Sequence, residues 1–262
     1  MTSVLGDPKQ AFLKALSLHR FCSTCTPDLS VTRGRKFIYA DDICLAIQGQ
    51  YFSELECSLS SDMSRISHFC RQRRLKPSAS KTISIVFRLH NTSDTRELSI
   101  YLDGQRLRYE CHPTYLGVTL HRTLSYREHL TKTAGKVKNR NNLMKLAGST
   151  WGASDADNTL RSSGLALCYS AAEYCAPVWS RSAHTSQVDV QLNCTMHLIS
   201  GTLWSQPLPW LPVLFNIEQP ALERKAATDK LVEKIIKHDS WPIQSDKLNP
   251  PLLQLTSRKP TS

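Results

Sequence analysis

The stretch Phe37-Ile38-Tyr39-Ala40-Asp41-Asp42-Ile43-Cys44-Leu45-Ala46-Ile47 decides how this chain is expected to fold. Its β-branched and aromatic residues predict two short strands that meet at a pair of neighbouring acids. Two carboxylates about 4 Å apart repel each other by about 4 kcal/mol at a protein surface, and a bound divalent cation reverses this effect. Carboxylate oxygens suit Mg²⁺, which often completes its shell with substrate phosphates. The acids therefore favour phosphoryl or nucleotidyl transfer.

An Asp-Asp pair between two strands is also typical of an ordinary turn. Aspartate tolerates the left-handed backbone region and its side chain bonds the nearby backbone. The dipeptide alone leaves both interpretations open, so the rest of the chain has to separate them.

The composition indicates a folded protein with an anionic partner. The chain has 262 residues, of which 40% are hydrophobic, enough for a sizeable core in one larger and one smaller unit. Lysine and arginine number 33 against 22 acidic residues, which gives a formal charge of +11. Such an excess attracts phosphate backbones, although an anionic membrane surface would satisfy the same charge. Nucleic acid is therefore the expected partner.

The nine cysteines are odd in number and widely spread, so they predict no disulfide framework. Only Cys22 and Cys25 have the spacing of zinc ligands, and because no second pair follows, ordinary buried thiols are the favoured interpretation. Neither a signal-peptide core nor a run of about 20 apolar residues is present. We expect an intracellular protein, nuclear or cytoplasmic, that is not secreted.

Hydrophobic periodicity predicts an α+β fold. A helix over 53–72 is expected to begin with Ser53 and Glu56 as a capping box and to bury one apolar stripe. The residues of that stripe are Leu55, Leu59, Met63, Ile66, Phe69 and Cys70. Further expected elements are a strand over 83–87, a hairpin over 98–109 with a type I′ turn at Asp103-Gly104, a strand over 115–120, and helices from 126, over 165–179 ended by Pro177, over 192–203 and over 221–238.

Tyr39-Ala40-Asp41-Asp42 inside an apolar hairpin resembles the palm motif of reverse transcriptases, in particular those of non-LTR (LINE-type) retrotransposons. The resemblance implies that Asp41 is a catalytic ligand of Mg²⁺ or Mn²⁺ and that Asp42 is its neighbour at the metal. Tyr39 and Ala40 would lie beside the primer end and the nucleotide. The partners implied are an RNA template and a DNA primer.

Two later segments resemble further parts of that palm, in the same order along the chain. Leu75 to Thr82 resembles the fourth palm motif, in which Lys81 would hold the triphosphate or protonate the leaving pyrophosphate. The family's asparagine and tryptophan fall on Ser78 and Arg73, and a solvated lysine is the alternative. Tyr115, Leu116 and Gly117, followed by valine, resemble the primer grip, where a glycine lets the backbone approach the primer.

The helix expected from residue 126 combines basic and apolar residues. By resemblance it is the thumb, whose basic side chains grip a duplex backbone, and a merely solvated face is the alternative. The basic residues are Arg127, Lys132, Lys136, Lys138, Arg140 and Lys145. The expected apolar positions are Leu130, Ala134, Val137, Leu143 and Leu146.

The first 34 residues match the family in two competing registers. In one, Asp7 with Ala11 and Phe12 takes the place of the first palm motif, whose aspartate binds metal. In the other, residues 21–30 end a helix and Asp7 has no catalytic counterpart. The Pro-Gln-Gly loop that the family carries between these motifs is not visible.

The resemblance predicts a divergent palm remnant over 1–34, a partial palm with an antiparallel sheet over 35–125, a helical thumb and connection over 126–240 and a flexible tail over 241–262. Three functions stay open. The chain is a truncated RNA-directed DNA polymerase domain that is not expected to act alone, a catalytically dead nucleic-acid-binding product of a retroelement, or a globular protein with a fortuitous Asp-Asp turn.

Overall fold

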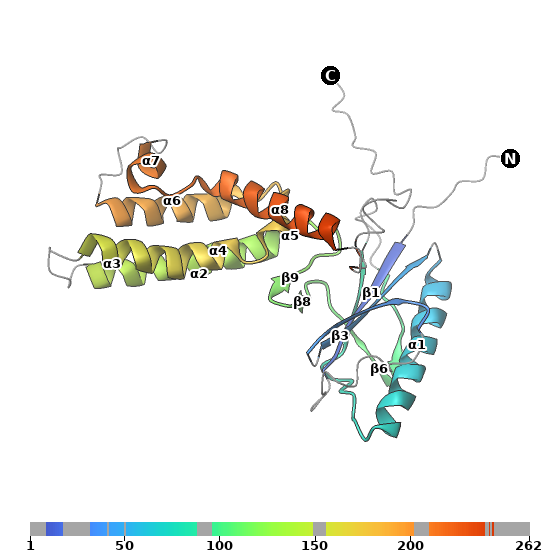
Figure 1. Ribbon diagram of the computed structural model, residues 1–262. Helices are drawn as coiled ribbons and strands as arrows, with labels where there is room; N and C mark the ends of the chain where they lie inside the picture. The colour runs from blue at the N-terminus through green and yellow to red at the C-terminus, as the bar shows by residue number, and fades with distance from the viewer. Residues whose placement is uncertain are drawn as a thin grey trace. The chain divides into compact units, whose positions relative to one another are not determined.

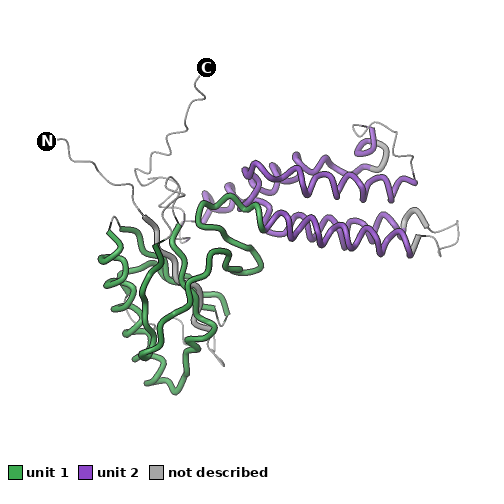
Figure 2. The backbone as a smooth tube through the Cα atoms, turned by 180° about the vertical axis from the view of Figure 1, so that it is seen from behind, with its two compact units in different colours: residues 1–128 green, residues 129–262 purple. Residues whose placement is uncertain are grey.

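The computed structural model describes residues 9–17, 32–40, 42–49, 51–87, 96–148, 156–201, 210–238, 241 and 243. The chain is an α+β protein, as predicted, and it divides into two compact units, residues 1–128 and 129–262 (Figure 2). Asp7, Asp41, the segment 21–30 with Cys22 and Cys25, and most of the expected tail lie outside the described residues. No helix in the described part of the chain has the length and apolar character needed to cross a lipid bilayer.

Unit 1 is built on a five-stranded sheet with the strand order β2-β3-β1-β4-β7 (Figure 1). The strands are β1 (Lys9–Ser17), β2 (Arg35–Tyr39), β3 (Asp42–Gly49), β4 (Ile83–Phe87) and β7 (Arg108–Tyr109). β1 pairs antiparallel with both β3 and β4, and β7 pairs parallel with β4. The sequence did not predict β1, because its alanine, lysine and leucine residues are good helix formers. Hydrogen-bonding partners on both of its edges outweigh that preference.

Helix α1 (Phe52–Gln72) supplies much of the hydrophobic core of unit 1. All six residues of the predicted apolar stripe are buried against side chains such as Ile43, Leu45 and Val86, so this prediction is confirmed. The predicted capping box is wrong. The N-cap is Tyr51, and Glu56 instead accepts a hydrogen bond from the Ser99 N–H at 2.8 Å, because the 96–100 segment lies alongside the helix.

Two tight hairpins lie before and after β7 in the chain. β5 (Tyr101–Leu102) and β6 (Gln105–Arg106) are joined by Asp103 and Gly104, whose φ angles of 49° and 80° confirm the predicted type I′ turn. The strand predicted over 115–120 is wrong. It is a second hairpin, β8 (Thr114–Tyr115) and β9 (Val118–Thr119), because Leu116 and Gly117 both adopt positive φ and reverse the chain.

Unit 2 is helical. Its elements are α2 (Arg127–Gly148, which begins at the end of unit 1), α3 (Ala156–Ser163), the π-helix η2 (Gly164–Tyr169), α4 (Ser170–Glu173), α5 (Ala176–Trp179), α6 (Ser186–Ser200), α7 (Leu211–Phe215) and α8 (Pro220–Lys237). The last of these confirms the helix predicted over 221–238. The helix predicted to end at Pro177 instead breaks at Cys175, where φ is 53°, and Pro177 lies in the first turn of α5. Proline is favoured there because its missing N–H is not needed.

The interface between α2, η2 and α6 contains a buried polar network. Asn141 donates to the Gln191 carbonyl at 2.9 Å and accepts from the Thr195 hydroxyl at 2.8 Å. The Cys168 thiol also donates to the Asn141 amide oxygen, at 3.4 Å. At Gly164 a Cβ would come within 2.6 Å of the Ile199 side chain, so the absence of a side chain there lets η2 and α6 approach closely. The predicted packing of 192–203 against the preceding helical segment is confirmed.

Candidate functional site

The carboxylate of Asp42 lies at the beginning of β3. Tyr39 is its partner on β2, and Ser17 is its partner on β1. Ala40 has a φ of 51° in the turn that joins the two strands, and Tyr39 is 65% exposed beyond them. Asp42 itself is half-buried, because the residues that follow it, Ile43 to Leu45, are core residues. The hairpin therefore presents one described acid and one exposed aromatic ring at an end of the sheet.

Tyr115 of the β8–β9 hairpin lies close enough to Asp42 to feel its charge. Burial, followed by interaction with the Cys44 thiol and with the Asp42 carboxylate, raises the pKa of Tyr115 to about 12. Burial, followed by the Asp42 charge, likewise raises the pKa of the Cys44 thiol. Two residues that the sequence assigned to one site, Asp42 and Tyr115, are thus neighbours, and Cys44 is a third neighbour that the sequence did not single out.

The neck of the β8–β9 hairpin holds a pair of histidines that sequence reasoning missed. The rings of His112 and His121 have centroids 5.0 Å apart, and the Leu120 N–H donates to the Pro113 carbonyl between them at 2.8 Å. The Thr123 N–H donates to Nδ1 of His121 at 3.2 Å, which requires an unprotonated nitrogen there. Burial, together with His112 and Arg122, lowers the pKa of His121. The neck is therefore uncharged at His121 at neutral pH.

Lys81 lies near the same end of the sheet as Asp42. β1 pairs Ser17 with Asp42 on one edge and Lys14 with Ile83 on the other, and Lys81 comes two residues before Ile83. The strands β3 and β4 are second neighbours, so they are about 10 Å apart. Lys81 is exposed there.

The carboxyl end of α1 adds positive charge to this end of unit 1. The helix starts just after Gly49 and packs on β3, and its 21 residues span roughly 31 Å, so it returns toward Asp42. Four basic residues end it or follow it: Arg71, Arg73, Arg74 and Lys76. Arg71 pairs with Asp103, where hydrogen bonds from Ser67 and then Arg71 hold the pKa of that carboxyl below its ordinary value.

The basic residues of α2 do not form one face. Lys132, Lys136 and Arg140 are spaced four apart and form one row, whereas Arg127 and Lys138 belong to another, on the far side of the buried stripe. Arg140 donates a hydrogen bond to the Leu167 carbonyl, so part of its hydrogen-bonding capacity stabilises the packing of α2 on η2. The single gripping face expected from the sequence is therefore two flanking rows.

A metal ion would find suitable oxygen atoms at the Asp41-Asp42 pair, since carboxylates are the ligands that Mg²⁺ and Mn²⁺ prefer. The described part of the chain supplies one of these, Asp42, and contains no group of three or more histidine, cysteine or acidic side chains arranged to hold a metal. Asp7 comes before β1 in the chain. The first residue of β1, Lys9, pairs with Gly49 of β3, which is seven residues along that strand from Asp42.

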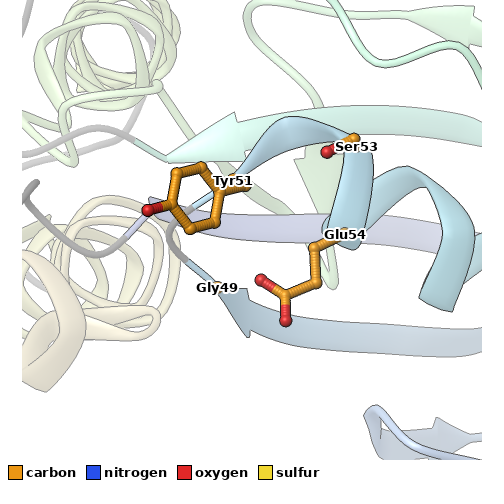
Figure 3. Close-up of a pocket in the computed structure, with 4 residues that line it drawn as sticks. All are labelled: Gly49, Tyr51, Ser53 and Glu54. Atoms are coloured by element: carbon orange, nitrogen blue, oxygen red, sulfur yellow. The ribbon is translucent and has the colours of Figure 1, made fainter.

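A hollow of about 620 Å³ lies at the Gly49 end of β3, not at the Asp42 end (Figure 3). It is lined by Gly49, Tyr51, Ser53 and Glu54. The hollow and Asp42 are separated by the length of β3, roughly 23 Å, so the hollow is not part of the candidate site.

Comparison of the chain with models of protein families, with curated proteins and with solved structures finds no match.

Proposed function

We propose that this chain is the carboxy-terminal part of an RNA-directed DNA polymerase of the non-LTR retrotransposon kind, and that it binds an RNA template and a DNA primer at the Asp42 end of the five-stranded sheet. The observation that carries the proposal is the strand register, which supports a common site for Asp42 and Lys81. The interaction of Tyr115 with Asp42 supports adding Tyr115 to that site. The basic end of α1 supports contact with phosphates at the same place. A fortuitous turn gives no reason for this grouping.

Under this proposal Asp41 and Asp42 hold Mg²⁺ or Mn²⁺, which would polarise the reacting phosphate. Tyr39 and Ala40 lie beside the primer end and the nucleotide, Tyr115 to Gly117 support the primer, and Lys81 holds the triphosphate. Two-metal transfer needs carboxylates from two separate palm strands. Because the described residues supply an acid from one strand, we propose binding as the function of this chain alone, and nucleotidyl transfer as that of the polymerase to which it belongs.

The second candidate function is nucleic-acid binding by a catalytically dead retroelement product. The formal charge of +11 favours it, because binding of phosphates needs no catalytic acids. Primer extension on a homopolymer template with Mg²⁺ or Mn²⁺ tests for polymerase activity. Incorporation that is lost in both Asp41→Asn and Asp42→Asn supports a polymerase and contradicts the second candidate, and incorporation that survives both substitutions removes the role given to the acids. Binding without any incorporation is expected of this chain alone under either candidate.

Binding itself is tested by fluorescence anisotropy with an RNA–DNA primer–template. We expect the affinity to fall at least about a hundredfold between 50 and 200 mM salt, since phosphate contacts release counterions. Replacing Arg74, Lys76 and Lys81 together with glutamine should reduce the slope of log affinity against log salt by about 2 to 3.

The matched control replaces three exposed lysines of α8, Lys225, Lys230 and Lys237, with glutamine, which changes the net charge equally. This control should keep most of the slope. Affinity that does not depend on salt, or equal losses in the two triple variants, would contradict a phosphate-binding site at the Asp42 end.

A further inference from the structure

Three oxygen-bearing side chains from different segments of unit 2 come together at α8. Tyr169 ends η2, and Glu173 follows four residues later at the end of α4, so the two lie on the same helical face. Glu223, in the first turn of α8, is hydrogen-bonded to the Glu173 side chain. Two carboxyl groups in such contact need a proton or a cation between them.

The Tyr169 hydroxyl is the second sign that a group is missing. The residue is 1% exposed, and its hydroxyl oxygen has no hydrogen-bond partner within the part of the chain that the structure describes. A buried hydroxyl left without a partner costs about 1–3 kcal/mol. Such an orphan commonly marks the place of a water molecule or an ion.

The charges around this hydroxyl are negative. After burial, Glu223 and then Glu173 are the main groups that raise the pKa of Tyr169. Burial, the hydrogen bond with Glu173 and the charges of Glu173 and Glu218 raise the pKa of Glu223 to about 7, and only Arg224 opposes them. Arg224 is already paired with Asp189 through two hydrogen bonds. The positive group that acts on Glu223 is thus engaged by another carboxylate.

We propose that Glu173, Glu223 and Tyr169 form a binding site for a divalent cation of the Mg²⁺ or Mn²⁺ type, which joins α4 to α8. The ion takes one oxygen from each carboxylate and the phenol oxygen, and water completes its shell. Two carboxylates suffice for such an ion, which usually keeps several waters. This site lies in unit 2 and shares no residue with the proposed Asp41-Asp42 site in unit 1.

A bound ion also stabilises the fold, because it binds the folded chain and not the unfolded one. At pH 8 we therefore expect saturating Mn²⁺ to raise the melting temperature of wild type more than that of Glu223→Gln.

The direct test measures free Mn²⁺ by electron paramagnetic resonance at pH 8, with the full chain carrying Asp41→Asn and Asp42→Asn so that the unit 1 acids do not contribute. We expect about one Mn²⁺ to be bound per chain, and at least tenfold weaker binding after Glu223→Gln. The control is Glu233→Gln, which removes the same charge from an exposed position of α8 and should leave the affinity unchanged.

Tyr169→Phe keeps the ring packed and removes only the hydroxyl, so it is expected to fold and to bind Mn²⁺ several-fold more weakly. If circular dichroism shows that Glu223→Gln does not fold, the Mn²⁺ affinity of Tyr169→Phe tests the proposal instead. The proposal is overturned by no binding at pH 8, by equal binding in Glu223→Gln and its parent, or by an equal loss in the control. None of these outcomes depends on whether the chain binds nucleic acid.

Discussion

Replacing Arg224 with alanine is expected to lower the free energy of unfolding by about 3 kcal/mol. Arg224 is 7% exposed, its Nη2 donates to Oδ2 of Asp189 at 3.0 Å, and its guanidinium lies 5.7 Å from the centre of the Trp179 ring. The substitution leaves the Asp189 carboxylate without its partner and also removes the contact with the ring. Asp189 is 30% exposed and regains some water, which places the cost at the lower end of the range for buried pairs.

Urea denaturation measures this effect, and three further variants identify its cause. Arg224→Lys keeps the charge but loses the two-pronged contact, so it should cost less than alanine. Adding Asp189→Asn to Arg224→Ala should recover part of the loss, because no unpaired charge remains. Lys225→Ala, at the adjacent exposed position, should change stability by less than about 0.5 kcal/mol. An equal loss in Lys225→Ala would show that the pair is not the cause.

The parts of the fold that the sequence predicted well are those fixed by local pattern. The stripe of α1 repeats every three or four residues, so burying it needs only a sheet to pack against. The Asp103-Gly104 turn is marked by residues that tolerate positive φ. Leu116 gives no such signal, since positive φ is uncommon for leucine, and the β8–β9 hairpin was therefore expected to be a single strand.

The sequence did not predict the features that depend on partners distant along the chain. β1 is a strand because β3 and β4 supply its hydrogen bonds, and nothing within 9–17 indicates this. The same holds for the candidate site. Motifs named Asp42, Lys81 and Tyr115 separately, but their common location follows from the strand register and from the packing of the second hairpin. Cys44, the His112–His121 neck and the Glu173–Glu223 pair belong to no motif.

Helix α2 shows how a pattern of apolar residues can mislead. The sequence assigned five residues to one apolar stripe: Leu130, Ala134, Val137, Leu143 and Leu146. Leu130 and Val137 are fully buried and Ala134 is half-buried, but Leu143 and Leu146 are 63% and 68% exposed, so the prediction is wrong for two of the five. The buried row continues instead through Asn141, whose amide finds partners on η2 and α6. A polar residue is stable inside the unit because each of its groups is hydrogen-bonded.

Leu130→Ala and Leu143→Ala test which side of α2 is buried, because they make the same change at two positions of one helix. Leu130→Ala should lower the free energy of unfolding by about 2–5 kcal/mol, because it removes a fully buried side chain and leaves a cavity. Leu143→Ala should change it by less than about 0.5 kcal/mol, since the side chain is mostly in water and alanine is the better helix former.

Urea denaturation of both variants, with far-ultraviolet circular dichroism as the probe, gives the two values directly. A large loss in Leu143→Ala would mean that this surface is covered in solution, by another chain or by nucleic acid. Measuring at two protein concentrations separates these cases, because self-association makes the loss depend on concentration. Similar small losses in both variants would contradict the packing of α2 in unit 2, and with it the physical basis for treating its basic rows as two separate flanks.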